Sequence, residues 1–210
     1  MRKLLKPAWA LVEENKRIYL ALNVTCYALV VVCMIYVAFN PELQQSLIEE
    51  VGAGFATGGP LAFVGEAYVN ARVITAIVVT FFVNLLVGSM ASITLPSLII
   101  PFSGVLVGAY RAILWGLLLS PANPNLRLIM IPPSITLVLE GQAYILAMLA
   151  AAIQGRTFLW PRTTGLESRI KGYVEGLKRT GRLYLLVLLT LGIAAIYEVI
   201  EVVVMIQFLG

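Results

Sequence analysis

Residues 183–209 read LYLLVLLTLGIAAIYEVIEVVVMIQFL, an apolar run long enough to cross a bilayer. A transmembrane α-helix needs about 20 mostly apolar residues. Four further runs of comparable length occupy residues 18–39, 73–90, 97–119 and 134–153. These runs predict an all-α fold: a polytopic membrane helix bundle with about five transmembrane helices.

The composition agrees with a membrane protein and excludes an ordinary soluble domain. Hydrophobic residues make up 60% of the 210 residues, and charged residues make up 12%. A soluble domain carries about twice that charged fraction. The charged residues before Pro7 are Arg2, Lys3 and Lys6, and the first apolar run does not begin until residue 18. Because no Ala-x-Ala cleavage site follows that run, we expect it to be a retained helix and not a signal peptide.

The segments outside the spans divide the chain into a short surface helix and a single membrane domain. Residues 1–17 place apolar side chains at spacings of three and four between basic residues, which predicts an amphipathic surface helix. Residues 18–210 form the membrane domain. Residues 42–70 read either as a surface helix or as a re-entrant piece. A second amphipathic helix, 166–178, is expected inside a basic segment, 154–182, that precedes the last span.

Basic residues indicate how the chain is oriented in the membrane. Five precede the first span, and seven lie in the segment 154–182: Arg2, Lys3, Lys6, Lys16 and Arg17, then Arg156, Arg162, Arg169, Lys171, Lys178, Arg179 and Arg182. With five spans, both groups fall on one side, and cytoplasmic loops are enriched in such residues. We therefore expect a multi-pass protein of the cell membrane with a cytoplasmic N-terminus, an extracytoplasmic C-terminus and contacts to anionic inner-leaflet lipids.

Four ionisable residues lie inside the predicted spans, where an unpaired charge is costly. They are Arg111, Glu140, Glu198 and Glu201. The helical rise places Arg111 and Glu201 roughly 12 Å, Glu140 roughly 9 Å and Glu198 roughly 16 Å below the outer surface of the apolar core. This common depth predicts a shared polar cluster. Two interpretations remain: an ion pair of Arg111 with Glu140 or Glu198 that fixes helix packing, or a hydrated cavity that binds or passes a cation.

A second set of polar and small residues is predicted nearer the inner side of the membrane. It comprises Asn84, Gly88, Ser103, Gly104 and Gly108. Gly104 and Gly108 form a GxxxG pattern, and small residues let helix backbones approach closely. We expect these residues to serve helix packing, with Asn84 as an interhelical hydrogen-bond partner.

The inventory of residue types excludes much chemistry. The chain contains no His and no Asp, and its two cysteines, Cys26 and Cys33, lie too far apart on one helix to bridge. Serine and cysteine triads and aspartyl dyads therefore cannot be assembled. The glycine-rich stretch 52–59 lacks the Lys-Ser/Thr ending of a phosphate loop. We expect no enzymatic activity, no catalytic residue, no metal, no cofactor and no nucleic-acid partner.

Several elements together resemble the stage II sporulation protein M family of small multi-spanning membrane proteins. They are Phe81-Phe-Val-Asn84, Ser103-Gly-Val-Leu-Val-Gly108, Glu140 and Tyr197-Glu198, and the resemblance covers roughly residues 70–210. Ser103 stands where the family has Asn, and the family's Pro-His-Gly element is absent. The resemblance implies a non-enzymatic membrane scaffold or assembly protein that acts through other membrane proteins.

Two functions therefore follow from the sequence. The first is the scaffold implied by the resemblance. The alternative is a small transporter or channel for a cation or proton that uses the Arg/Glu cluster, with a homo-oligomer left open. A dry, fully paired cluster would favour the scaffold, and a cavity reaching the outer surface would favour transport.

Overall fold

The computed structural model describes residues 2–56, 58–59, 61–69, 72–121 and 127–209. Within these ranges every regular element is a helix, and no strand occurs. In the described part of the chain, four helical stretches are long and apolar enough to cross a membrane: Lys16–Ala38, Val73–Ile99, Ile135–Leu159 and Arg169–Val203. A shorter apolar helix covers Ser103–Leu118. The expected all-α bundle is confirmed, and the chain is a membrane-embedded protein.

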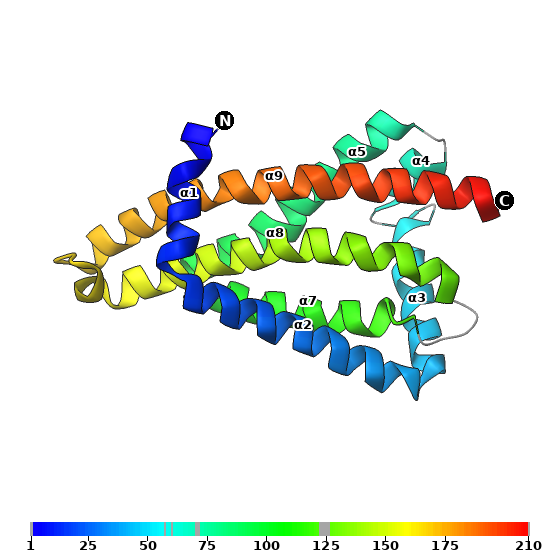
Figure 1. The fold of residues 1–210 in the computed structure, drawn as a ribbon, viewed down its shortest axis with the longest axis horizontal. Coiled ribbons are helices and arrows are strands. Elements are labelled where there is room, and N and C mark those ends of the chain that lie inside the picture. The colour runs from blue at the N-terminus through cyan, green and yellow to red at the C-terminus, as the bar shows by residue number, and fades with distance from the viewer. Residues whose placement is uncertain (1, 57, 60, 70–71, 122–126, 210) are drawn as a thin grey trace.

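The two longest helices form the centre of the bundle. They are α8 (Arg127–Leu159) and α9 (Arg169–Leu209), which run antiparallel side by side (Figure 1). Residues 143–153 of α8 are all buried. Helices α2 (Lys16–Ala38) and α7 (Ser103–Leu118) pack on each other and on α8. Helix α8 is therefore shielded from lipid over most of its inner turns, whereas α2 exposes much of its apolar surface.

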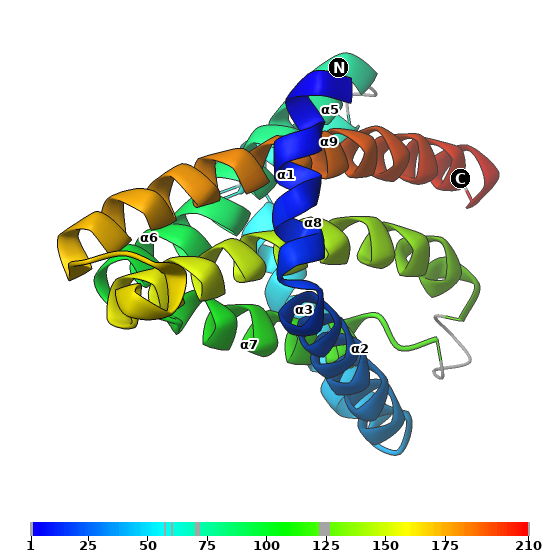
Figure 2. The same ribbon diagram turned by 60° about the vertical axis from the view of Figure 1, so that its left-hand side comes forward.

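Short helices lie at both ends of the bundle. Helix α1 (Arg2–Glu14) crosses α9 toward one end of the bundle, and its buried face packs on α9 (Figures 1 and 2). At the other end lie α3 (Pro41–Phe55) and α4 (Ala62–Val69). The amide of Gln44 donates to the carbonyls of Leu118 (3.0 Å) and Ser120 (2.9 Å), which ties α3 across the end of α7.

The second long helix does not end where the sequence predicted. It continues without a turn through three consecutive helical segments: α5 (Val73–Phe82), the π-helical η1 (Val83–Thr94) and α6 (Leu95–Ile99). The predicted end at residue 90 and the predicted turn at 91–96 are therefore wrong. Pro96 does not end the helix, because membrane helices tolerate proline where local π adjustments re-satisfy the backbone. The wide η1 segment directly before Pro96 is such an adjustment.

The turn lies instead at residues 100–102, so the predicted start of the third span at residue 97 is also wrong. Ile100 has an extended backbone (φ −113°, ψ 101°), as expected for a residue that precedes a proline. Phe102 adopts a left-handed conformation with φ 69°. Pro101 thus belongs to the turn, and α7 begins at Ser103.

The basic segment 154–182 is not a separate surface piece. Helix α8 continues to Leu159, a 3-10 turn (η2, Pro161–Thr164) follows, and α9 then runs unbroken from Arg169. The predicted separate helix 166–178 and the predicted start of the last span at residue 183 are therefore wrong, because no proline separates the two stretches. A Cβ added to Gly176 would lie 2.8 Å from Cδ of Gln154, so this glycine permits the close approach of α9 to α8.

Candidate functional site

A cavity of about 210 Å³ is lined by residues of α8 and α9 and by the end of α7. Three carboxyl groups line it: Glu140 of α8, and Glu198 and Glu201 of α9. Residues three apart share one face of a helix, so α9 presents both of its glutamates to the same space. The remaining lining residues are Trp115, Leu119, Thr136, Leu137 and Val202. The three predicted glutamates thus surround one partly open cavity.

Glu140 is held by two side chains from different helices. The amide Nδ2 of Asn84 donates to its Oε1, and a side-chain hydrogen bond joins it to Glu198. An ionised carboxylate has no proton to donate, so a bond between two carboxyl groups requires that one of them be protonated. The carboxyl groups of Glu140 and Glu198 can therefore bond to each other when they share a proton.

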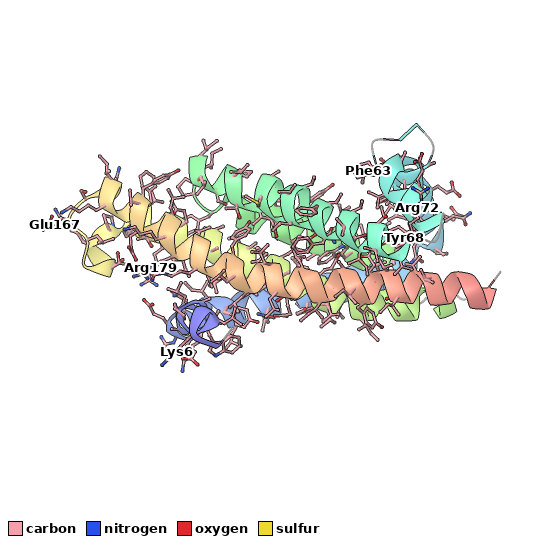
Figure 3. The ribbon with its side chains drawn as sticks, turned by 90° about the horizontal axis from the view of Figure 1, so that it is seen from above. Lys6, Phe63, Tyr68, Arg72, Glu167 and Arg179 are labelled. Carbon is pink, nitrogen blue, oxygen red and sulfur yellow. The ribbon has the colours of Figure 1, made fainter. Side chains whose placement is uncertain are left out.

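Glu198 is also bound by the short helix α4. The hydroxyl of Tyr68 lies 3.1 Å from its Oε1 and 2.7 Å from Oγ1 of Thr80. Burial and the neighbouring Glu198 raise the pKa of Tyr68 above its ordinary value, so its hydroxyl stays protonated. Tyr68 is thus a proton donor fixed beside Glu198, at the end of the bundle opposite Lys6 and Arg179 (Figure 3).

Glu201 completes the set of carboxyl groups and is more loosely held. It is 9% exposed, and its Oε2 accepts a hydrogen bond of 2.8 Å from the hydroxyl of Thr136. Among the described residues, no salt bridge joins a basic side chain to Glu140, Glu198 or Glu201. The cavity therefore gathers acidic groups without a cation in direct contact.

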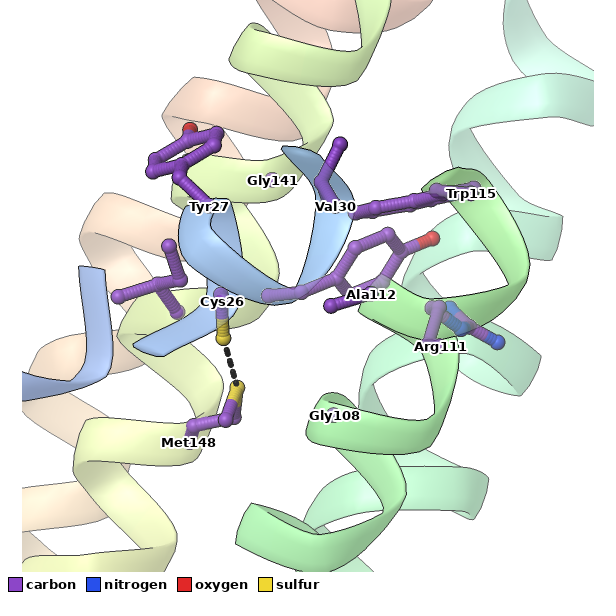
Figure 4. A pocket seen from close by; sticks show the side chains of 11 residues that line it. Cys26, Tyr27, Val30, Gly108, Arg111, Ala112, Trp115, Gly141 and Met148 are labelled. Carbon is purple, nitrogen blue, oxygen red and sulfur yellow. Dashed lines mark hydrogen bonds between the residues drawn. The ribbon is translucent and has the colours of Figure 1, made fainter. Parts of the chain in front are cut away.

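Arg111 does not form the predicted ion pair. Its guanidinium carbon lies 4.5 Å from the centre of the Tyr144 ring, and its Nη1 donates to the carbonyl of Gly88 (3.4 Å). Figure 4 shows Arg111 on α7 beside Trp115 and one turn from Gly108. It lines a narrow space next to the carboxyl cavity, and its charge still attracts that of Glu140. The expectation of an ion pair was wrong because the guanidinium of Arg111 is directed at the ring of Tyr144 and the carbonyl of Gly88.

The second predicted set does not lie apart from the cluster. Since the second long helix extends to Ile99, Asn84 stands near its middle and reaches Glu140. Its predicted place nearer the inner side of the membrane depended on the wrong helix end.

The three glycines of that set lie at close helix contacts. A Cβ on Gly88 would stand 2.5 Å from the Tyr144 hydroxyl, one on Gly104 would stand 2.9 Å from the carbonyl carbon of Ile93, and one on Gly108 would meet Met148. Ser103 begins α7, and its buried hydroxyl has no hydrogen-bond partner among the described residues.

Four contributors to the site were missed from the sequence: Tyr68, Thr80, Thr136 and Tyr144. Thr136 and Tyr144 stand four residues to either side of Glu140, so helical spacing could have found them. Tyr68 and Thr80 had no such signal. Tyr68 reaches both Thr80 and Glu198 because α4 packs against α5 and α9.

The arrangement suits the uptake of protons or of a hydrated cation. In the part of the chain that the structure describes, no group of three or more His, Cys, Asp or Glu side chains is placed to hold a metal ion. Carboxyl groups at membrane depth mark proton relays and ion pathways in membrane proteins. Comparisons with protein-family models, with curated proteins and with solved structures find no match to this chain. The resemblance to the sporulation protein family therefore stays a prediction.

The position of Arg111 makes a testable prediction about stability. We expect Arg111→Leu to lower the free energy of unfolding by about 2 kcal/mol, because a desolvated cation–π contact contributes that much. A double-mutant cycle with Glu140→Gln should give a coupling of at least about 0.5 kcal/mol. The matched cycle with Glu201→Gln should be additive, since Glu201 contacts Thr136 instead. Equilibrium unfolding in detergent measures the coupling energy in both cycles. Coupling of Arg111 to Glu201 without coupling to Glu140 would contradict the observed position of Arg111.

Proposed function

We propose that this protein binds and passes a small cation, in the simplest case a proton, through the cavity lined by Glu140, Glu198 and Glu201. Three carboxyl groups surround one partly open cavity of about 210 Å³, and no basic side chain among the described residues is in ion-pair contact with them; this observation carries the proposal. Packing alone does not require three acids at membrane depth, because each is costly there unless it is neutralised or hydrated.

The hydrogen bonds suggest how a proton would travel. Among the residues that the structure describes, Thr136 alone donates a hydrogen bond to Glu201, so we assign Glu201 as the entry group of the cavity. The pair of Glu198 and Glu140 holds the proton next, with Tyr68 and Asn84 fixing its two ends. No covalent step is part of this function, and the protein acts without enzymatic chemistry.

We also propose how the protein is oriented in the cell membrane. Lys6 and Arg179 lie toward one end of the bundle, while Tyr68 and Arg72 lie toward the other (Figure 3). Since cytoplasmic segments are enriched in Lys and Arg, the first end is assigned to the cytoplasm and the C-terminus to the outside. The carboxyl cavity then lies in the outer half of the membrane. Other membrane proteins and further copies of the chain are partners through the lipid-facing helices.

Cysteine labelling tests this orientation. In a variant with Cys26 and Cys33 replaced by alanine, Lys171→Cys should react with an impermeant maleimide only from the cytoplasmic side. Glu50→Cys should react only from outside, since α3 lies at the opposite end of the bundle from the α8–α9 hairpin. Reversed labelling would place the carboxyl cavity in the inner half.

Flux through reconstituted vesicles tests the function itself. Liposomes that contain the protein should acidify faster than empty liposomes after an external acid step, with a valinomycin–potassium clamp to remove the membrane potential. Repeating the measurement with sodium and potassium gradients identifies the cation. Flux equal to that of empty vesicles in every case would overturn the proposal and favour the scaffold.

A further inference from the structure

We infer that the junction of α1 and α2 binds the phosphate of an anionic phospholipid headgroup. A second cavity, of about 290 Å³, opens at this junction. That volume is roughly ten times the share of one water in the liquid, which is about 30 Å³. Three basic side chains line it: Lys16 and Arg17 from the first turn of α2, and Arg156 from the last turn of α8.

The three cations are free to bind an external anion. Within the described ranges, Lys16, Arg17 and Arg156 make no salt bridge and no side-chain hydrogen bond. Of the two carboxylates at the rim, Glu14 is bound by Arg179 at 3.3 Å, and this leaves Glu13. Arginine presents a planar set of donors that matches phosphate oxygens. The cavity thus has an excess of uncommitted positive charge with suitable geometry.

The surroundings of the cavity favour a lipid over a soluble anion. Helix α1 lies across the end of the bundle, and its Trp9 is 55% exposed, as is common for aromatic side chains at a membrane interface. Ile18 lines the cavity directly after the basic pair. Beyond it, Leu20 (58% exposed) and Val24 (69% exposed) present an apolar surface on α2. An acyl chain can lie on this surface while its headgroup stays among the cations.

This site is separate from the proposed cation path. Its lining residues belong to α1, α2 and the end of α8 beyond the buried core, and none of them lines the carboxyl cavity. The two proposals can therefore fail independently. Glu198→Gln should leave lipid binding unchanged, and a protein without measurable flux can still bind the lipid.

Titration of the detergent-solubilised full chain with dioleoylphosphatidylglycerol, followed by native mass spectrometry, tests the inference. Arg156→Gln and Arg17→Gln should each weaken binding about fivefold, the effect expected for one basic residue at a charged membrane surface. Arg156→Lys should retain most of the affinity. Arg162→Gln, an equal loss of charge in the 3-10 turn η2, is the matched control and should change binding less than twofold.

Three results of this experiment would contradict a specific site for an anionic lipid. Equal binding of dioleoylphosphatidylcholine would remove the role of the negative charge. An equal loss in Arg162→Gln would indicate a diffuse surface charge instead of a site. If inorganic phosphate at the same concentration displaced the lipid, the occupant would be a soluble anion. The altered side chains are exposed, and an unchanged gel-filtration profile and circular dichroism spectrum confirm that each variant is folded.

Discussion

Replacing Glu198 by Gln is expected to reduce cation flux in liposomes at least about tenfold, to the level of empty vesicles. Glutamine keeps the size of the side chain and can still bond to Tyr68 and Glu140, but it can neither hold a negative charge nor exchange a proton. Since Glu198 lies between Tyr68 and Glu140, its loss interrupts the chain of groups at its centre. Glu140→Gln should have the same effect.

The matched control is Glu167→Gln on the α8–α9 hairpin. Its side chain is 81% exposed and pairs with Lys171, far from the carboxyl cavity, so flux should equal that of the unaltered protein. Glu201→Gln should give a partial loss, because this residue is the entry group and not the centre. If Glu198→Gln keeps full flux while the unaltered protein exceeds background, the path does not use this cavity. If all variants and the unaltered protein stay at background, the scaffold function is favoured.

The largest expected effect on stability comes from Gly116→Leu. A Cβ at Gly116 would lie 2.5 Å from the carbonyl oxygen of Val30 and 3.0 Å from its Cα. These atoms belong to the backbone of α2, so no side-chain rotation can make room. Overpacking a buried contact costs about 1–3 kcal/mol and occasionally more, and the backbone clash puts this substitution at the upper end, about 3 kcal/mol.

Gly192→Leu is the matched control. Apart from its own stretch of α9, no atom of the described residues lies within 4 Å of a Cβ added at Gly192. Its midpoint of thermal unfolding in detergent, followed by circular dichroism, should stay near that of the unaltered protein, while that of Gly116→Leu falls sharply. Gly116→Ala provides a folded variant with a smaller loss in case the leucine variant does not fold. Equal midpoints for the Gly116 and Gly192 leucine variants would show that α2 and α7 are not closely packed.

For the charged residues within the helices, sequence spacing predicted the depth of each residue but not the contacts of its side chain. The helical rise and the lengths of the apolar runs predicted that Glu140, Glu198 and Glu201 share one depth, and the structure places them around one cavity. The same reasoning paired Arg111 with a glutamate, whereas it contacts Tyr144 and Gly88. Depth follows from chain length, but the direction in which a side chain points depends on the rotation of its helix against its neighbours.

The ends of the helices could not be predicted from local sequence patterns. Span boundaries were predicted between residues 90 and 97 and at residue 183, yet helices continue through residues 91–96 and through residue 183. Local patterns cannot tell whether a break is repaired by a π segment or whether two helical stretches join. Asn84 was consequently placed at the wrong depth, and its contact with Glu140 was missed.

The sequence by itself determined that this chain is a helical membrane protein with acidic residues at membrane depth, because apolar length and the rise of a helix are local properties. Only the tertiary structure decided which groups meet there: Tyr68 of α4 at Glu198, Asn84 at Glu140, and Arg111 on the face of Tyr144. Those contacts join residues far apart in the chain. They depend on how closely helices approach at glycines such as Gly88 and Gly116, and on the packing of all the helices at once.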